Sequence, residues 1–194
     1  MVAQALSRSH TAAQAARRSH NVDWLEQILL SQRHGHSCLP LHLGLDERTH
    51  AALIQASFPD LLRQYGSAPP RAEECNALRA QLLELRRDEW QELRDLLLGN
   101  RRGEDGHEPA LASIVAAACL GGGHLWHDLG LTSRDQLREL LEYNFPQLAG
   151  RNVNNMRWKK FFYKQLCEQD GGYVCRSPNC EDCPTYHDCF GEEL

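Results

Sequence analysis

The sequence predicts a mainly α-helical fold that ends in an irregular, cysteine-rich C-terminal segment. Apolar residues recur at steps near 3.6 through most of the chain, which is typical of amphipathic helices. No stretch shows the strict alternation of a strand, and there is no internal repeat. From Cys175 onward the composition changes, because four of the eight cysteines fall within fifteen residues. We expect residues 1–20 to form a disordered tail, 21–170 a helical domain and 171–194 a metal-binding segment.

Three helices are predicted before residue 66. The first begins after Asp23, buries an apolar face and ends near the loop at 33–40, which contains glycine and proline. The second opens at Asp46 and ends before Pro59. A short third helix spans residues 59–65 and is stopped by Gly66.

The longest periodic segment spans residues 73–98 and predicts one long helix. Its remaining faces are charged, which is typical of a solvated surface. The apolar stripe consists of Leu78, Leu82, Leu85, Trp90, Leu93 and Leu97. The pair at 99–100, glycine followed by asparagine, ends this helix.

Three more helices follow a polar loop. Pro109 suits the first turn of a helix through Leu120 that is apolar on most faces and therefore predicted to be the buried centre. Ser133 and Gln136 form a capping box for the next helix. The last helix runs from 156 to about 169, with the asparagines at 152, 154 and 155 as N-cap candidates.

Length and charge exclude several classes of protein. The 194 residues allow one domain with small appendages, and a net charge of −5 disfavours nucleic-acid binding. No run of 18 apolar residues is present, so a membrane span is not predicted. Residues 1–20 hold three arginines and no acid, which suits a frayed tail or a transit peptide, and they lack the apolar run of a secretory signal. We therefore expect the cysteines to be thiols or metal ligands rather than disulfides.

The C-terminal cysteines have the spacing Cys-x4-Cys-x2-Cys-x5-Cys and are Cys175, Cys180, Cys183 and Cys189. Two prolines deny this segment a regular helix, and a metal centre could supply the missing cross-links. Residues 168–194 carry seven acids and one base, which raises thiol pKa values and disfavours thiol catalysis. Metal coordination reverses this effect, because it deprotonates the thiols. Zinc modules usually have two Cys-x2-Cys pairs separated by a longer insert, whereas this segment has one such pair with a cysteine close on each side. The spacing therefore favours an iron–sulfur cluster, and zinc stays the alternative.

Other metal-binding side chains have both a functional and a structural interpretation. The possible additional ligands are His187, His124, His127 and Cys167. The alternative for His187 is an exposed position in a loop. For His124 and His127 it is structural hydrogen bonding, and for Cys167 it is packing as a small apolar residue. A second cluster, which could bind zinc or form a surface loop, consists of His34, His36, Cys38 and His42. Cys75 and Cys119 lie on predicted helices and are expected in the core.

Four stretches of the chain carry a family resemblance. They are residues 124–131 (HLWHDLGL), 155–163 (NMRWKKFFY), 166–168 (LCE) and 175–191 with its closing CFG. Together they resemble the NifQ family of nitrogen-fixation proteins, whose signature is the same cysteine spacing. The resemblance is strong over roughly 70 residues, weaker over 40–120 and absent from the first 20.

The resemblance implies a molybdenum carrier of the bacterial cytoplasm rather than an enzyme. Family members are thought to hold an iron–sulfur precursor that takes up molybdenum and forms a molybdenum–iron–sulfur cluster. They pass molybdenum to the machinery that assembles the iron–molybdenum cofactor, with molybdate as the metal source. The implied recipients are the nitrogenase iron protein and the cofactor-assembly scaffold complex. The four C-terminal cysteines carry over as cluster ligands.

The helix at 156–166 concentrates positive charge. Residues 151–164 contain five bases, among them all three lysines of the protein, and no acid. The helix bases are Arg157, Lys159, Lys160 and Lys164. They form either a solvated face that offsets the acidic tail or a site that attracts molybdate or an acidic partner.

Two other classes of function stay open at this stage. One is a zinc-stapled interaction module, and the other is a small iron–sulfur electron-transfer protein. The sequence contains no nucleophile elbow, Walker loop, dinucleotide fingerprint or zinc-protease motif, which agrees with a carrier.

Overall fold

The computed structural model describes residues 19–60, 70–169, 171 and 186–191. The helices are α2 (His20–Arg33), α3 (Glu47–Ser57), α5 (Pro70–Leu85), α6 (Arg87–Gly99), α7 (Glu108–Cys119), α8 (Leu125–Leu129), α9 (Arg134–Asn144), α10 (Pro146–Ala149), α11 (Trp158–Gln169) and α12 (Tyr186–Phe190). Within these ranges there is no strand, so the prediction of a mainly α fold is confirmed for them.

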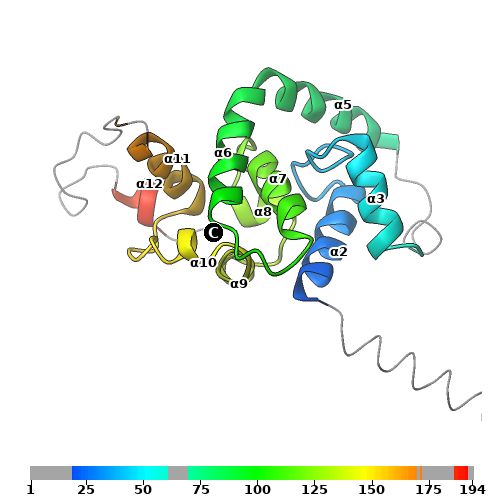
Figure 1. Ribbon diagram of the computed structural model, residues 1–194. Helices are drawn as coiled ribbons and strands as arrows, with labels where there is room; N and C mark the ends of the chain where they lie inside the picture. The colour runs from blue at the N-terminus through cyan, green and yellow to red at the C-terminus, as the bar shows by residue number, and fades with distance from the viewer. Residues whose placement is uncertain (1–18, 61–69, 170, 172–185, 192–194) are drawn as a thin grey trace, which may run out of the picture.

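One apolar core centred on α7 organises the helices (Figure 1). Helices α6 and α8 pack against α7, and α11 packs against α6 on the side that carries α12. Helices α2 and α3 lie on the opposite side of α7. The predicted burial of the central helix is confirmed, because Leu111, Ile114 and Val115 are fully buried.

Side-chain caps fix where several helices begin. Helix α2 starts at His20 and is capped by Ser19, three to four residues earlier than the Asp23 start expected from the sequence. The Asp46 carboxylate accepts the Thr49 N–H and opens α3, as predicted. Such caps satisfy N–H groups that have no acceptor inside the helix.

The predicted capping box of α9 forms only in part. The Ser133 hydroxyl accepts the Gln136 N–H at 3.1 Å. The Gln136 side chain does not reach back to the backbone of Ser133, and instead accepts the Thr132 N–H at 2.8 Å. Gln136 is also paired with Gln27, so it connects α9 to α2 as well as capping it.

The prediction of one long helix at 73–98 is wrong, because the chain bends at Arg86. This residue has φ −114° and ψ 31°, and it separates α5 from α6. Its guanidinium donates to the Leu120 carbonyl at 2.9 Å and pairs with Glu89. The bend lets α6 pack along α7 while α5 crosses the top of the molecule in Figure 1.

The two halves of the apolar stripe consequently have different environments. Leu93 and Leu97 of α6 are fully buried, whereas Leu78 and Leu85 of α5 are 68% and 84% exposed. Periodicity alone could not show this difference, because both halves have helical spacing.

Two further segments differ from the prediction. Residues 125–129 form α8, a helix that is not among those predicted from the sequence, and Gly130 ends it in the left-handed region at φ 78°. In the C-terminal segment, Tyr186–Phe190 forms α12, which begins after Pro184 and so does not contain it. The predicted helix at 59–65 lies outside the described residues, as do residues 1–18 of the predicted tail. No helix in the described ranges is both long and apolar enough to cross a membrane.

Candidate functional site

Three segments that are distant in sequence converge on one pocket. They are the glycine-rich connection after α7, the start of α11 and the C-terminal α12. The pocket has a volume of about 290 Å³ and is lined by Gly122, Gly123, His124, Leu125, Arg157, Trp158, Lys159, Lys160 and Asp188. The structure therefore gathers three of the four predicted basic residues with one of the predicted histidines.

The last cysteine of the motif is held at the edge of this pocket. The Arg157 N–H donates to the Cys189 carbonyl at 2.7 Å, and the Arg157 Nε donates to the Gly191 carbonyl at 3.4 Å. Cys189 is half-buried on α12, which lies beside α11 (Figure 1). The backbone at residues 189 and 191 is thus anchored to Arg157, the residue just before α11. Cys175, Cys180 and Cys183 lie outside the described residues.

The Lys159 side chain is only 16% exposed and makes its contacts inside the protein. Its ammonium donates to the Gly121 carbonyl at 2.8 Å and forms an ion pair with Asp128. The Asp128 side chain is only 7% exposed, and it also accepts the Gly123 N–H at 3.0 Å. Lys159 and Asp128 together fix the glycine-rich connection that forms one wall of the pocket.

Gly121 must be small for this arrangement to form. A Cβ atom there would lie 2.5 Å from both the Asp128 carboxylate and the Cys38 sulfur. Real contacts to a Cβ are longer than this, so a larger residue would displace the Asp128 carboxylate or the Cys38 thiol.

Lys160 and Lys164 differ in their surroundings although both are exposed on α11. Lys160 lines the pocket and has no hydrogen bond or ion pair with any described residue. Lys164 lies one turn further along, pairs with Glu168 at 3.2 Å and does not line the pocket. The four predicted bases therefore have different roles. Arg157 anchors the backbone of residues 189 and 191, and the partly buried Lys159 pairs with Asp128. Lys160 is an exposed cation of the pocket, and Lys164 belongs to a surface ion pair.

The predicted additional ligands are not gathered at one point. His124 is half-buried in the pocket wall, whereas the side chain of His127 is 67% exposed and outside the pocket. His187 is exposed on α12, and Cys167 is half-buried on α11. In the part of the chain that the structure describes, no three histidine, cysteine or acidic side chains are arranged to hold a metal ion.

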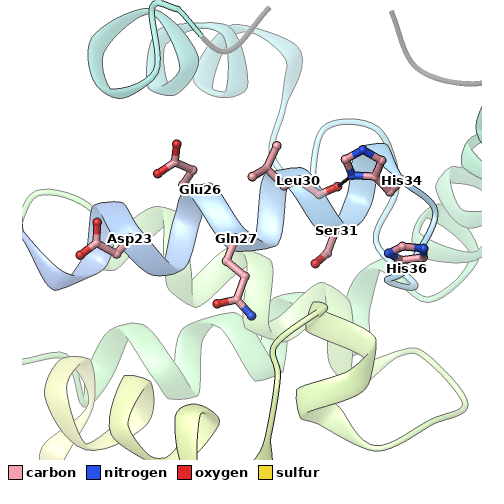
Figure 2. Close-up of a pocket in the computed structure, with 7 residues that line it drawn as sticks. All are labelled: Asp23, Glu26, Gln27, Leu30, Ser31, His34 and His36. Atoms are coloured by element: carbon pink, nitrogen blue, oxygen red, sulfur yellow. Dashed lines mark hydrogen bonds between the residues drawn. The ribbon is translucent and has the colours of Figure 1, made fainter. Parts of the chain in front are cut away.

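The second predicted cluster, His34, His36, Cys38 and His42, does not form one site in the described part of the chain. His34 and His36 stack with ring centroids 6.0 Å apart and line a separate pocket of about 450 Å³ with Asp23 and Glu26 (Figure 2). In this pocket the His34 Nδ1 lies 2.7 Å from the Leu30 carbonyl oxygen. These side chains are spread along α2 and the loop after it, so the surface-loop interpretation describes them.

The other two residues of that cluster have separate partners. His42 packs against His50, and burial followed by the neighbouring His42 lowers the pKa of His50 to about 4. Cys38 faces the interior, where its backbone N–H donates to the Asp128 carbonyl at 3.0 Å. Sequence spacing could not separate these roles, because all four residues lie within one short loop.

Cys38, in the loop after α2, packs against the core, and Cys119 of α7 lies within it. Burial, more than the nearby Asp128 carboxylate, raises the pKa of Cys38 to about 12. Burial raises the pKa of Cys119 to about 12 as well, and this side chain is 3% exposed. The core position predicted for Cys119 is confirmed, while the side chain of Cys75 lies outside the described part.

A polar group that the sequence did not reveal lies between α6 and α11. Tyr163 donates its hydroxyl proton to Glu89, which also accepts from Arg86 at 2.6 Å. Burial and this hydrogen bond raise the pKa of Tyr163. The sequence places Tyr163 on a predicted helix but gives no partner for it, because Glu89 lies 74 residues away.

Comparisons with known proteins identify the same family that the sequence motifs resemble. The NifQ family model matches residues 24–191 of this chain. Protein NifQ of Azotobacter vinelandii is 68% identical over 172 residues, which cover 88% of each protein. Protein NifQ of Klebsiella pneumoniae is 39% identical over 170 residues, which cover 87% of this chain and 98% of the relative. No solved structure matches the chain. The chain therefore belongs to the NifQ family of nitrogen-fixation proteins.

Proposed function

We propose that this protein is a molybdenum carrier for assembly of the iron–molybdenum cofactor. Its cargo is a molybdenum–iron–sulfur cluster, and the proposed ligands are Cys175, Cys180, Cys183 and Cys189. Thiolates suit this cargo, because soft sulfur ligands bind iron–sulfur clusters well. The family membership supports a role in nitrogen fixation, and the cysteine spacing supports the cluster.

The observation that carries this proposal is the position of Cys189. It is half-buried at the end of the motif, and its backbone is hydrogen-bonded to Arg157 at the start of a basic helix. A cluster with four thiolate ligands adds negative charge to a segment that is already acidic. The adjacent bases offset part of this charge, so the docked segment suits a thiolate-bound cluster.

The cysteines of the core are poor candidates for the same role. Cys38 and Cys119 have raised pKa values and lie apart from the C-terminal segment in sequence. A thiol must lose its proton to bind a metal, and the buried environment opposes this loss. We therefore assign cargo binding to the C-terminal quartet alone.

The protein acts by holding and handing on its cargo rather than by turning over a substrate. We propose the nitrogenase iron protein and the cofactor-assembly scaffold complex as recipients. Cys189 is exposed enough to exchange a ligand, since it is half-buried on α12 while its backbone is hydrogen-bonded to Arg157. Purified carrier mixed with each recipient should lose molybdenum to it, and a carrier that keeps its molybdenum with both recipients would contradict this assignment.

Metal content and visible absorption test the cargo directly. Protein purified without oxygen should be brown, absorb broadly near ~400 nm and contain iron, sulfide and molybdenum. Iron without molybdenum in protein isolated from molybdate-supplied, nitrogen-fixing cells would instead indicate an electron-transfer protein. A colourless protein with stoichiometric zinc would exclude both iron-containing functions.

A further inference from the structure

The pocket beside Cys189 has the properties of a small anion site. It contains three cationic side chains and one histidine from two separate segments, against one carboxylate. It is also lined by the first residues of α11, a twelve-residue helix. The first N–H groups of a helix have no acceptor within it and favour anions.

Lys160 is the cation that the protein leaves unused in this pocket. Lys159 is already paired with Asp128, and the Arg157 guanidinium reaches the Gly191 carbonyl. Lys160, in contrast, makes no hydrogen bond or ion pair with any residue of the described ranges. An exposed cation at the mouth of such a pocket attracts and contacts anions.

Trp158, one of the residues that line the pocket, carries an unpaired donor. Its side chain is 3% exposed, and its indole Nε1 has no hydrogen-bond partner among the described residues. Buried donors in proteins are normally paired. The indole N–H is therefore a donor next to the pocket that no described residue satisfies.

We propose that this pocket binds a small tetrahedral oxyanion, held by Lys160 and the start of α11. The assignment of the oxyanion as molybdate rests on the proposed function, whereas the existence of the site does not. Molybdate bound here would wait next to Cys189, at the edge of the segment that is proposed to receive its metal.

The Asp188 carboxylate opposes the binding of an anion in this pocket. It is the one carboxylate in the pocket wall, and it belongs to the same short helix as Cys189. Its negative charge opposes a bound oxyanion, so its removal should tighten binding. An anion that enters the pocket consequently competes with the docked C-terminal segment for the same positive potential.

Titration calorimetry on the full-length, metal-free protein tests the proposal with molybdate, tungstate, sulfate and phosphate as probes. Lys160→Gln should weaken molybdate binding about tenfold, because one charge-assisted contact is lost. Lys164→Gln is the matched control on the same helix and should leave the affinity unchanged. Asp188→Asn should tighten binding about threefold, since one repulsive charge is removed.

Each outcome bears on the proposal. No heat of binding for any of the four anions at millimolar concentration would overturn the site, and equal losses in Lys160→Gln and Lys164→Gln would show unspecific attraction. Sulfate bound as tightly as molybdate would support the oxyanion site and overturn its assignment to molybdate. Serine at all four motif cysteines should leave oxyanion binding intact, so failure of this site and failure of the proposed cluster can be told apart.

Discussion

Two cysteines of the helical domain, Cys38 and Cys119, differ chemically from the C-terminal quartet. The thiols of Cys38 and Cys119 are held in the interior, where burial raises both pKa values to about 12. The thiolate is the reactive form of cysteine, so at neutral pH almost none of either side chain is reactive. The C-terminal quartet is the group on which the proposed chemistry depends.

Thiol labelling of the native, metal-free protein should reveal this division. At pH 7.5 a thiol reagent should leave Cys38 and Cys119 unmodified, and unfolding in denaturant should make both react. Raising the pH to 9 should add little reaction at these two sites, because both pKa values lie well above 9. Peptide mass spectrometry locates the label, and fast native modification of Cys119 would contradict its burial.

Two adjacent lysines should behave as opposites in stability measurements. Lys159→Met removes the partner of a carboxylate that is 7% exposed, and leaving such a charge unpaired costs roughly 2–4 kcal/mol. Lys160→Met changes an exposed side chain without a partner in the described structure and should alter the free energy of unfolding by less than about 0.5 kcal/mol. Urea unfolding measures both, and equal effects of the two substitutions would contradict the ion pair.

At the scale of helices, the bend at Arg86 is a feature that hydrophobic periodicity did not predict. The stripe from residue 78 to 97 has continuous helical spacing, and nothing in it marks an interruption. Arg86 is fixed by two distant partners, the Leu120 carbonyl and the Tyr163 hydroxyl, in addition to the nearby Glu89. Such tertiary contacts override local propensity.

Alanine substitutions in the two halves of this stripe should have unequal costs. Leu93→Ala removes most of a fully buried side chain and leaves a cavity in its place, so it should destabilise the protein by about 2–5 kcal/mol. Leu78→Ala changes a side chain that is 68% exposed and should cost less than about 1 kcal/mol. Thermal or urea unfolding compares them, and a large cost for Leu78→Ala in the isolated protein would show that α5 packs differently.

Local signals did predict most helix starts and ends. Asp46, Ser133 and Pro109 all stand where the sequence predicted a helix to begin. These signals succeed because a cap or a first-turn proline acts within a few residues of its own position. Helix α8 was missed because five residues between two glycine-containing segments give too short a pattern to recognise.

For the molecule as a whole, the sequence predicted the class of fold, but it did not predict how distant segments are arranged around the pocket. The basic character of residues 157–160 was readable, but their different partners were not. Only the folded chain brings Asp128 to Lys159 and places Asp188 in the pocket with Lys160. These contacts join segments more than 25 residues apart, which no local pattern reports.

The pocket and the cysteine motif together give an account of the whole protein. A helical domain holds the start of α11 rigid, and the C-terminal segment docks there through the Cys189 carbonyl. The domain supplies positive charge, while the segment supplies sulfur. In the described part of the segment, the contact between the two includes the hydrogen bond from the Arg157 N–H to the Cys189 carbonyl.

The central claim is that the C-terminal quartet alone holds the iron- and molybdenum-containing cargo. Its most direct test is the iron and molybdenum content of protein purified without oxygen after serine replacement of Cys175, Cys180, Cys183 and Cys189, beside a Cys119→Ala control. We expect the control to keep both metals at the level of the unaltered protein and the quartet variant to lose both. A folded quartet variant that retained both metals would contradict the claim.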